Sequence, residues 1–321
     1  MNTSISVRMK RQYIEVPLPI ECNVVHRLWR KLVGIFLMPC YVIAAQILGT
    51  PGITIHIKCA YLGVRLFLLR RISLRTCYFL ICFPMDSTRY FEFHEVLKSL
   101  VHIPFYRYLD VSSPRIVPLL LLMQNRVAVA EMMNPDKRDI EEVERLANAL
   151  GLGDRCTFTN RTIEMANYAA KTFDLITSIS VLEHIPADRE ALDMMWSLLR
   201  PGGRLILTLP CMAQPLEQYI SRDYYGVLSP ESDGYTFWQR YYDEERLKSV
   251  IFNITGLPAK MVVYGERSNG LFHRNANMKR LLGPLYPYWR ESFMVAKEYR
   301  YFRTITELPG EGVVMLEFVK P

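Results

Sequence analysis

Two short apolar runs with a helical stretch between them decide the fold: residues 173–185 read FDLITSISVLEHI and residues 199–210 read LRPGGRLILTLP. Each run is long enough for one buried strand. In the second run, a Pro-Gly-Gly turn comes before most of the apolar residues. Two strands joined through a helix lie parallel, because a parallel pair needs a long crossover connection. The stretch therefore predicts a strand-helix-strand unit within a parallel sheet.

The connecting helix has one apolar face. Positions i, i+3, i+4 and i+7 are occupied by Leu192, Met195, Trp196 and Leu199. This spacing places them on one side of a helix that packs on the sheet, and on spacing alone Met195 and Trp196 are interpreted as core residues. We expect Asp188 to be the N-cap, and the Pro-Gly-Gly turn at residues 201–203 to end the helix.

On the N-terminal side of this unit, short apolar runs again alternate with a helical pattern. Residues 107–111 and 126–132 are predicted to form the first two strands, and residues 156–162 the third. Such alternation predicts a doubly wound α/β sheet, which binds its ligand at the carboxyl ends of the strands.

The pattern between the second and third strands predicts a helix with marked ends. Asn134 is expected to be its N-cap, with Pro135 in the first turn and Gly151 at the end. Its apolar face is expected to consist of Ile140, Val143, Leu146 and Leu150.

The amino-acid sequence of these segments resembles that of class I S-adenosylmethionine-dependent methyltransferases. In that family the fourth strand commonly begins Phe-Asp and leads into Leu-Glu-His, and the fifth follows Leu-Arg-Pro-Gly-Gly, as here. The resemblance implies a seven-stranded Rossmann-like sheet. The expected divisions are a methyltransferase-like domain over residues 85–321 with insertions at 211–240 and 267–312, and final strands at 259–266 and 313–319, the latter antiparallel.

The resemblance implies S-adenosylmethionine as cofactor and carries binding roles onto particular residues. In the family the first strand ends in an acidic residue followed by a Gly-x-Gly loop. Asp110 stands at the acidic position, but residues 111–115 read VSSPR, so both expected glycines are absent. Ser112 and Ser113 are small, and a tight turn there is expected to present backbone N–H groups to the cofactor.

Further cofactor contacts are implied at the next two strands. Glu131, followed by Met132, ends the second strand, where the family places a carboxylate that accepts hydrogen bonds from the ribose hydroxyls. Thr162 occupies the position at which the family has an acidic residue that contacts adenine. Adenine recognition is therefore expected to rest on Thr162, Ile163 and backbone groups.

Three residues at and beyond the fourth strand complete the predicted centre. Ser178 and Ile179 match positions whose backbone faces the methionine part of the cofactor. His184 lies just beyond, and because an imidazole titrates near neutrality it is the first candidate for a catalytic base if the acceptor is a hydroxyl. The alternative is that His184 makes only a structural hydrogen bond.

The acceptor is expected to meet residues outside the core of the sheet. Insertions after the fifth strand normally wall the acceptor pocket in this fold, which makes Tyr225 and Trp238 candidate substrate contacts, with loop packing as the alternative. In related enzymes a helix before the first strand folds over the cofactor. Arg89 and Tyr90 are therefore candidate substrate-binding residues that meet the cofactor carboxylate.

Composition limits the partners. The chain has 321 residues and a net charge of +7, and residues 1–106 carry thirteen Lys or Arg against five Asp or Glu. No dense basic stripe interleaved with aromatic residues lies in the catalytic part, so we expect no nucleic-acid partner. Seven scattered cysteines show no metal-ligand spacing, which predicts no metal site and free thiols. Without a signal-peptide pattern, a cytoplasmic location is expected.

Residues 1–84 are expected to form a helical, apolar and basic extension. Residues 32–57 hold no formally charged residue but are broken by prolines and glycines, including Gly-Thr-Pro-Gly at 49–52. Residues 61–71 are apolar with interspersed arginines, as in an interfacial helix. Two accounts stay open: the extension packs on the catalytic domain as a helical cap, or it makes a peripheral contact with a membrane.

The function predicted is methyl transfer to an unidentified small-molecule or lipid-like acceptor. One alternative is a non-catalytic methyltransferase-like binding or assembly module that has lost its cofactor, suggested by Ser112, Pro114 and Thr162. Another is a nicotinamide-dependent Rossmann enzyme, which is disfavoured because no G-x-G-x-x-G follows any predicted strand.

Overall fold

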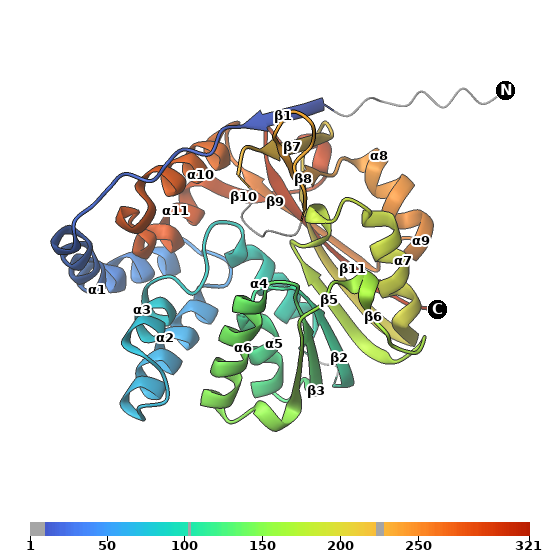
Figure 1. The fold of residues 1–321 in the computed structure, drawn as a ribbon, viewed down its shortest axis with the longest axis horizontal. Helices are drawn as coiled ribbons and strands as arrows, with labels where there is room; N and C mark the ends of the chain where they lie inside the picture. Colours follow the sequence, from blue (N-terminus) through green and yellow to red (C-terminus); the bar gives the residue numbers. More distant parts are fainter. Residues whose placement is uncertain (1–9, 102–103, 223–227) are drawn as a thin grey trace.

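The computed structural model describes residues 10–101, 104–222 and 228–321, and a large mixed sheet lies at its centre (Figure 1). The strands of this sheet are β2 (Phe105–Val111), β3 (Val127–Met133), β4 (Cys156–Thr159), β5 (Phe173–Ile179), β6 (Leu199–Cys211), β9 (Lys260–Glu266), β10 (Tyr299–Phe302) and β11 (Gly312–Val319). Their order is β10-β9-β11-β6-β5-β2-β3-β4. The predicted doubly wound fold is confirmed, with β10 as an added strand at one edge.

The remaining elements cover this sheet or extend from it. A second, small sheet has the order β1-β7-β8 and consists of β1 (Lys10–Ile14), β7 (Leu216–Ile220) and β8 (Thr236–Tyr241). The helices are α1 (Val24–Ile47), α2 (Ile53–Leu68), α3 (Leu74–Cys82), α4 (Arg89–Ser99), α5 (Ile116–Met123), α6 (Lys137–Leu150), α7 (Asp188–Leu198), α8 (Glu244–Arg246), α9 (Asn253–Thr255), α10 (Leu271–Leu282) and α11 (Glu291–Glu298). Short helical turns are η1 (Gly153–Arg155), η2 (Ile163–Met165), η3 (Leu182–His184), η4 (Leu247–Phe252), η5 (Gly283–Leu285), η6 (Tyr288–Arg290) and η7 (Ile305–Glu307).

The predicted strand-helix-strand unit is β5, α7 and β6. β5 is buried along its whole length and pairs in parallel with β6, as a central strand covered on both faces should. The expected N-cap is wrong, because α7 begins at Asp188 and its cap is Ala187. The Asp188 carboxylate instead accepts hydrogen bonds from Tyr242 and Arg246, each at 2.8 Å. Asp188 therefore ties α7 to the segment that follows the 211–240 insertion.

The helix after β3 also differs from expectation at its start. Its cap is Asp136, whose Oδ1 accepts from the Arg138 backbone N–H at 2.9 Å, while Asn134 accepts from the Asp136 N–H. Asn134 therefore shapes the turn that precedes the helix, and the proline lies before the cap. Gly151 ends α6 in the left-handed conformation as predicted, with φ of 74°. β4 ends at Thr159, three residues earlier than expected.

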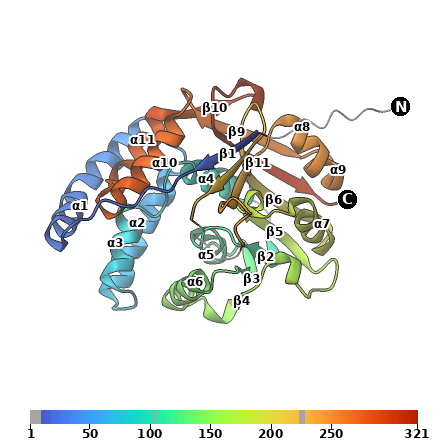
Figure 2. The same cartoon turned by 45° about the horizontal axis from the view of Figure 1, so that its top comes forward.

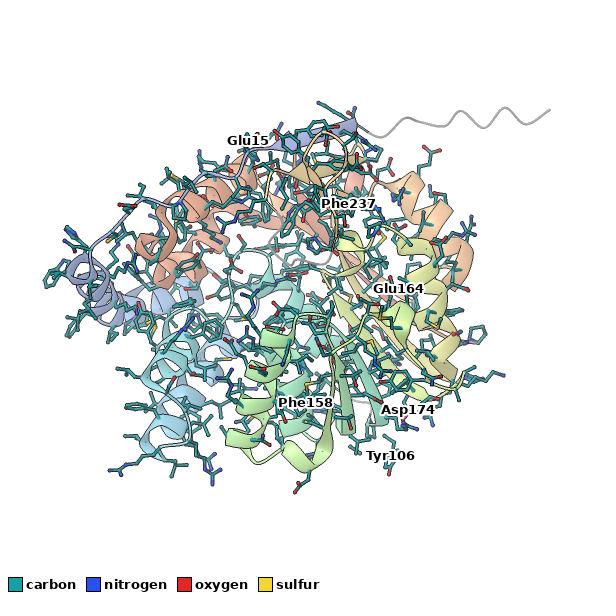
Figure 3. The ribbon with its side chains drawn as sticks, viewed as in Figure 1. Glu15, Tyr106, Phe158, Glu164, Asp174 and Phe237 are labelled. Carbon is teal, nitrogen blue, oxygen red and sulfur yellow. The ribbon has the colours of Figure 1, made fainter. Side chains whose placement is uncertain are left out.

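The last strand runs antiparallel, as expected. β11 pairs antiparallel with both β6 and β9, so it completes the sheet between them. At the amino edge of the parallel strands, Asp174 accepts from the backbone N–H groups of Tyr106 and Arg107 at 2.7 and 2.8 Å. Figure 3 shows Asp174 and Tyr106 at this edge, on the side of the sheet away from Phe237. The opposite, carboxyl edge is the one available for ligands.

The N-terminal extension is helical, as predicted, and it packs on the rest of the protein. α1, α2 and α3 lie together at one side of the molecule, next to α10 and α11 (Figures 1 and 2). β1 pairs in parallel with β7, so the extension also adds a strand to the insertion at residues 211–240. The small sheet was not expected, because its two parts are about 200 residues apart in the sequence.

Candidate active site

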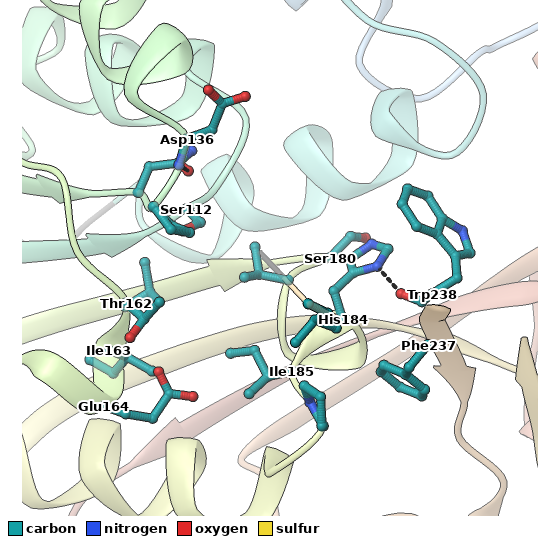
Figure 4. Close-up of a pocket in the computed structure, with 16 residues that line it drawn as sticks. Ser112, Asp136, Thr162, Ile163, Glu164, Ser180, His184, Ile185, Phe237 and Trp238 are labelled. Atoms are coloured by element: carbon teal, nitrogen blue, oxygen red, sulfur yellow. Dashed lines mark hydrogen bonds between the residues drawn. The ribbon is translucent and has the colours of Figure 1, made fainter. Parts of the chain in front are cut away.

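A cavity of about 310 Å³ opens at the carboxyl edge of the sheet, beside the ends of β2, β3 and β5. Figure 4 shows the side chains that surround it. Five of the sequence-predicted site residues line this cavity: Ser112, Thr162, Ile163, His184 and Trp238. We call it the cofactor cavity, because the fold binds its ligand at this edge.

A second cavity, of about 250 Å³, adjoins the first. Its walls come from the start of α4, β8, α10 and the start of β11, and they include the predicted Arg89. Ser180, His184 and Trp238 line both cavities. We call the second one the acceptor cavity, because it meets the cofactor cavity at these three residues.

Asp110 lies beneath the cofactor cavity rather than in its wall. Its carboxylate is buried and accepts from the Ser113 backbone N–H at 3.1 Å, the Thr177 hydroxyl at 2.8 Å and the Tyr108 hydroxyl at 2.9 Å. Burial raises the pKa of Asp110 to about 6, and these hydrogen bonds oppose the rise. Asp110 thus holds the loop after β2 in shape from below.

The loop keeps a glycine-like backbone although its glycines are absent. Ser112 has φ of 53°, a left-handed conformation that glycine normally occupies. Its backbone N–H and hydroxyl both donate to the Met133 carbonyl, at 2.8 and 3.1 Å. These bonds to the end of β3 hold the serine in a conformation that is strained for a residue with a Cβ.

Two more serines near the site share this conformation. Ser87 has φ of 45° and lines the acceptor cavity, and Ser180 has φ of 47° and lines both cavities. Ser180 is held by Glu92, which also accepts from Thr208 at 2.6 Å and from Arg89 at 3.0 Å. Backbone strain of this kind gathers at ligand sites, where the surrounding structure holds it in place.

Glu131 and Met132 lie outside the lining of the cofactor cavity. Glu131 pairs with Leu109, two positions before the last β2–β3 pair, so its side chain lies below the edge of the sheet. The Tyr168 hydroxyl donates to its carboxylate at 2.5 Å. The carboxylates that do line the cavity are Asp136 and Glu164. Figure 4 shows the Glu164 side chain directed toward Ile185.

The predicted contacts to the methionine part are held within the core. Ser178 and Ile179 are fully buried in β5, and the Ile179 N–H donates to the Ser113 hydroxyl at 3.1 Å. The Ser178 hydroxyl is buried without a hydrogen-bond partner among the described residues. Ser113 is itself buried, so it joins the loop to β5 and does not line the cofactor cavity.

His184 sits where the two cavities meet. Its Nδ1 is 2.5 Å from the Trp238 carbonyl oxygen, which can only accept, so the ring donates from Nδ1 and Nε2 carries the lone pair. Burial lowers the pKa of His184 to about 4, against the effect of the Trp238 carbonyl. The ring is therefore neutral at physiological pH and is a weak base.

The neighbouring carboxyl has the opposite perturbation. Glu183 lines the acceptor cavity, its side chain is 3% exposed, and its Oε2 is buried with no hydrogen-bond partner among the described residues. Burial raises its pKa to about 8. A carboxyl with this pKa is a much better base near neutrality than the His184 imidazole. The sequence analysis did not predict Glu183 as a site residue, although it stands beside His184 in the Leu-Glu-His motif.

The predicted substrate contacts divide among three places. Arg89 lines the acceptor cavity, and its guanidinium bonds to Glu92 and approaches the Ile179 carbonyl at 3.5 Å. Tyr90 is fully buried, and its hydroxyl bonds to His56, so it does not reach either cavity. Tyr225 lies outside the described residues. Trp238 lines both cavities, as noted above.

The acceptor cavity contains further charged groups that the sequence did not indicate. Lys279 on α10 pairs with Asp86 and with Glu291, each at 2.9 Å. Burial alone lowers the pKa of Lys279, but these carboxylates raise it well above its usual range. Burial raises the pKa of Glu311 to about 7, although Tyr241 donates to it at 2.5 Å. Because α10 is remote in sequence, no local signal predicts these contacts.

A metal site has no support in the described part of the chain. Among those residues, no group of three or more His, Cys, Asp or Glu side chains is placed to hold a metal ion.

The family comparison agrees with this geometry. Residues 94–251 match a family model described as "Methyltransferase domain". The matched segment begins in α4 and ends in η4, so it includes β2, β3 and the unit of β5, α7 and β6, whose ends border the cofactor cavity. The match confirms a methyltransferase domain over this part of the chain, as the sequence predicted, and S-adenosylmethionine is the cofactor that the resemblance implies.

Solved structures of similar fold include the MccD protein, at 10% identity and a TM-score of 0.50, over 74% of this chain and 100% of that one. Another is a geranyl diphosphate C-methyltransferase from Streptomyces coelicolor A3(2), at 9% identity and a TM-score of 0.45, over 71% and 74%. The cyclase SpnF matches at 16% identity and a TM-score of 0.43, over 71% and 79%. At these identities the likeness concerns the fold alone. A search of curated protein sequences gave no match.

Proposed function

We propose that the protein transfers the methyl group of S-adenosylmethionine to a polar group on a small molecule or on the head group of a lipid. The observation that carries the proposal is that the cofactor and acceptor cavities meet at Ser180, His184 and Trp238. Methyl transfer needs a donor and an acceptor held end to end in a shielded site. Two adjoining cavities at the carboxyl edge of the sheet offer that arrangement.

Residues of the cofactor cavity fit this cofactor. Asp136 follows β3 at the rim, so we assign to it the ribose contact that the sequence placed on Glu131. Val111 and Ile163 give apolar surface for the adenine ring. The left-handed backbone at Ser112 supports the close approach of ligand that the family's glycines allow.

The acceptor cavity favours a polar substrate. Arg89, Lys279, Glu183 and Glu311 all line it, and an apolar chain buried against them would leave these polar groups poorly solvated. A hydroxyl or amine on the acceptor would instead find hydrogen-bond partners here. The shared chemistry is therefore a small polar group, whether it belongs to a free metabolite or to a lipid head group.

The proton of the acceptor needs a base, and we assign that role to Glu183. The bound cofactor supplies a methyl group that its positive sulfur has already activated. An acceptor hydroxyl or amine loses a proton when it is methylated, and Glu183 would take that proton. His184, held by the Trp238 carbonyl, positions the acceptor through the lone pair on Nε2.

Calorimetric titration of the full chain with S-adenosylhomocysteine tests the proposal without knowledge of the acceptor. We expect saturable binding, and no heat from NAD⁺ used as the matched control. Absence of S-adenosylhomocysteine binding at millimolar concentration, with the protein folded by circular dichroism, would favour the non-catalytic module. Binding of NAD⁺ alone would favour a nicotinamide-dependent enzyme.

A further inference from the structure

α1 presents a continuous apolar stripe to solvent. Trp29 is 65% exposed, Phe36 76% and Ile47 79%, although core helices of soluble proteins bury such side chains. They belong to a row at helical spacing on one side of the helix: Val25, Trp29, Leu32, Phe36, Ile43 and Ile47.

α2 repeats the pattern beside it. Ile57, Tyr61, Val64 and Leu68 lie at i, i+4, i+7 and i+11 and are all exposed, with Leu68 74% exposed. The opposite side of α2 is buried against its neighbours, as the hydrogen bonds of His56 show. We call the two exposed rows together the outer apolar face. Its size needs an explanation, because soluble monomers seldom expose broad apolar patches.

The charged residues on α1 and α2 themselves are all basic. Residues 22–85 contain eight Lys or Arg and no Asp or Glu. Lys58 and Arg65 each follow a member of the α2 row by one residue, and both are exposed. Long basic side chains beside apolar ones keep their charge at a polar boundary while their stems cover apolar surface. A surface that matches this pattern has an anionic layer for the basic groups above an apolar layer for the exposed rows.

α1 lies on the protein rather than leaving it. By length and composition α1 is able to cross a bilayer, and 11% of its most apolar window is buried. However, a Cβ at Gly34 would lie 2.6 Å from Trp289, and the Tyr41 ring is 5.7 Å from Phe293. Arg30 donates to the Leu285 carbonyl at 3.0 Å. These contacts hold the middle of α1 against the folded domain, which favours a helix that lies on a membrane over one that spans it.

We propose that the outer apolar face docks on the surface of an anionic lipid bilayer, with α1 and α2 in the plane of the interface. A second copy of the chain is a poorer occupant, because a symmetric contact would bring two sets of basic residues together with no acidic partner. The bilayer supplies both the apolar layer and the negative charge. The proposal does not depend on the methyl-transfer reaction.

Cosedimentation of the full chain with vesicles tests the docking. We expect at least tenfold tighter binding to vesicles of phosphatidylcholine with phosphatidylserine than to phosphatidylcholine alone, weakened by added salt. Sodium carbonate should release the protein, since it removes peripheral proteins and leaves spanning ones. Lipids brominated in their acyl chains should quench fluorescence of wild-type protein, and the Trp29→Phe variant should lose most of that quenching.

Substitutions locate the surface. Phe36→Glu combined with Leu68→Glu should weaken binding to the anionic vesicles at least tenfold. Leu257→Glu is the matched control, because Leu257 is 82% exposed and follows α9, away from the outer apolar face. This control should bind as the wild type does, and all three proteins should have the same melting temperature within a few degrees.

Four outcomes would overturn the proposal. They are absence of binding to either vesicle, equal binding by the Phe36/Leu68 double variant, retention after carbonate, and a wild-type dimer in solution that the double variant converts to monomer. The last result would assign the outer apolar face to a second copy of the chain.

Discussion

His56 of α2 accepts a hydrogen bond from the hydroxyl of Tyr90 in α4, with 2.7 Å between Nδ1 and the oxygen. Its Nε2 lies 2.8 Å from the Ile81 carbonyl, which can only accept, so Nε2 carries the proton and Nδ1 is the acceptor. Both side chains are buried. The pair joins the N-terminal extension to the catalytic part. It does so through Tyr90, which the sequence analysis gave as a candidate substrate contact.

Tyr90→Phe should lower the free energy of unfolding by about 1–3 kcal/mol, because it leaves a buried acceptor without its donor. Urea unfolding measures the change, and S-adenosylhomocysteine affinity should stay the same. Tyr301→Phe is a control: its hydroxyl donates to Glu95 at 3.2 Å but the residue is half exposed, so the cost should be within about 0.5 kcal/mol. Loss of ligand binding at full stability would instead make Tyr90 a ligand contact.

At Ser112 the usual order of stability between an alanine and a glycine variant should be reversed. Alanine is ordinarily the more stabilising of the two, by roughly 0.5–1 kcal/mol in regular structure. Because Ser112 has φ of 53°, a Cβ is strained there, so Ser112→Gly should be more stable than Ser112→Ala by about 1 kcal/mol. Thermal unfolding compares the two variants, which lack the same hydroxyl. An alanine variant at least as stable would show that the loop is not held left-handed.

The ribose assignment distinguishes two carboxylates. Asp136→Asn should weaken S-adenosylhomocysteine binding by about 1.5–3 kcal/mol, the range for a hydrogen bond to a charged group. Glu131→Gln is the matched control: Glu131 lies below the edge and bonds to Tyr168, and glutamine can keep that bond, so affinity should not change. The reverse result in calorimetry would return the ribose contact to Glu131 and reject our assignment.

Local patterns predicted much of the fold, and the reasons for the misses are specific. The sheet and the β5–α7–β6 unit depend on apolar runs and turn residues that are adjacent in the sequence, whereas the antiparallel direction of the last strand came from the family resemblance. Glu131 was predicted because the family places a carboxylate at the end of the second strand; in the structure the strand continues through Met133, so Glu131 lies two pairs before its end. Separation along the sequence explains the remaining differences. The contacts of Lys279 and the β1–β7 pairing join segments that only tertiary packing brings together.

Acid should destabilise the protein through its buried histidines. The folded pKa of His184, about 4, is below its unfolded value of 6.5, so the unfolded state binds the proton first as pH falls. The contribution of His184 to stability is therefore complete above pH 6.5 and decreases toward pH 4, by at most about 3 kcal/mol. His184→Asn keeps a donor for the Trp238 carbonyl and should flatten this part of the curve. An unchanged acid slope would contradict the burial of a neutral ring.

Glu183 should behave in the opposite direction. Its folded pKa, about 8, is above the unfolded value of 4.5, so the folded protein retains a proton that the unfolded chain releases. Its contribution is complete below pH 4.5 and is lost as pH rises through 8, and Glu183→Gln should remove this alkaline loss of stability. Infrared difference spectra should show a protonated carboxyl band that disappears as pH rises through 8 and is smaller in the variant, in which Glu311, with its pKa of about 7, still contributes. Glu190→Gln, at an exposed carboxylate on α7, should leave the band in place. A Glu183 that is ionised throughout would lack the proton affinity that we assign to the base.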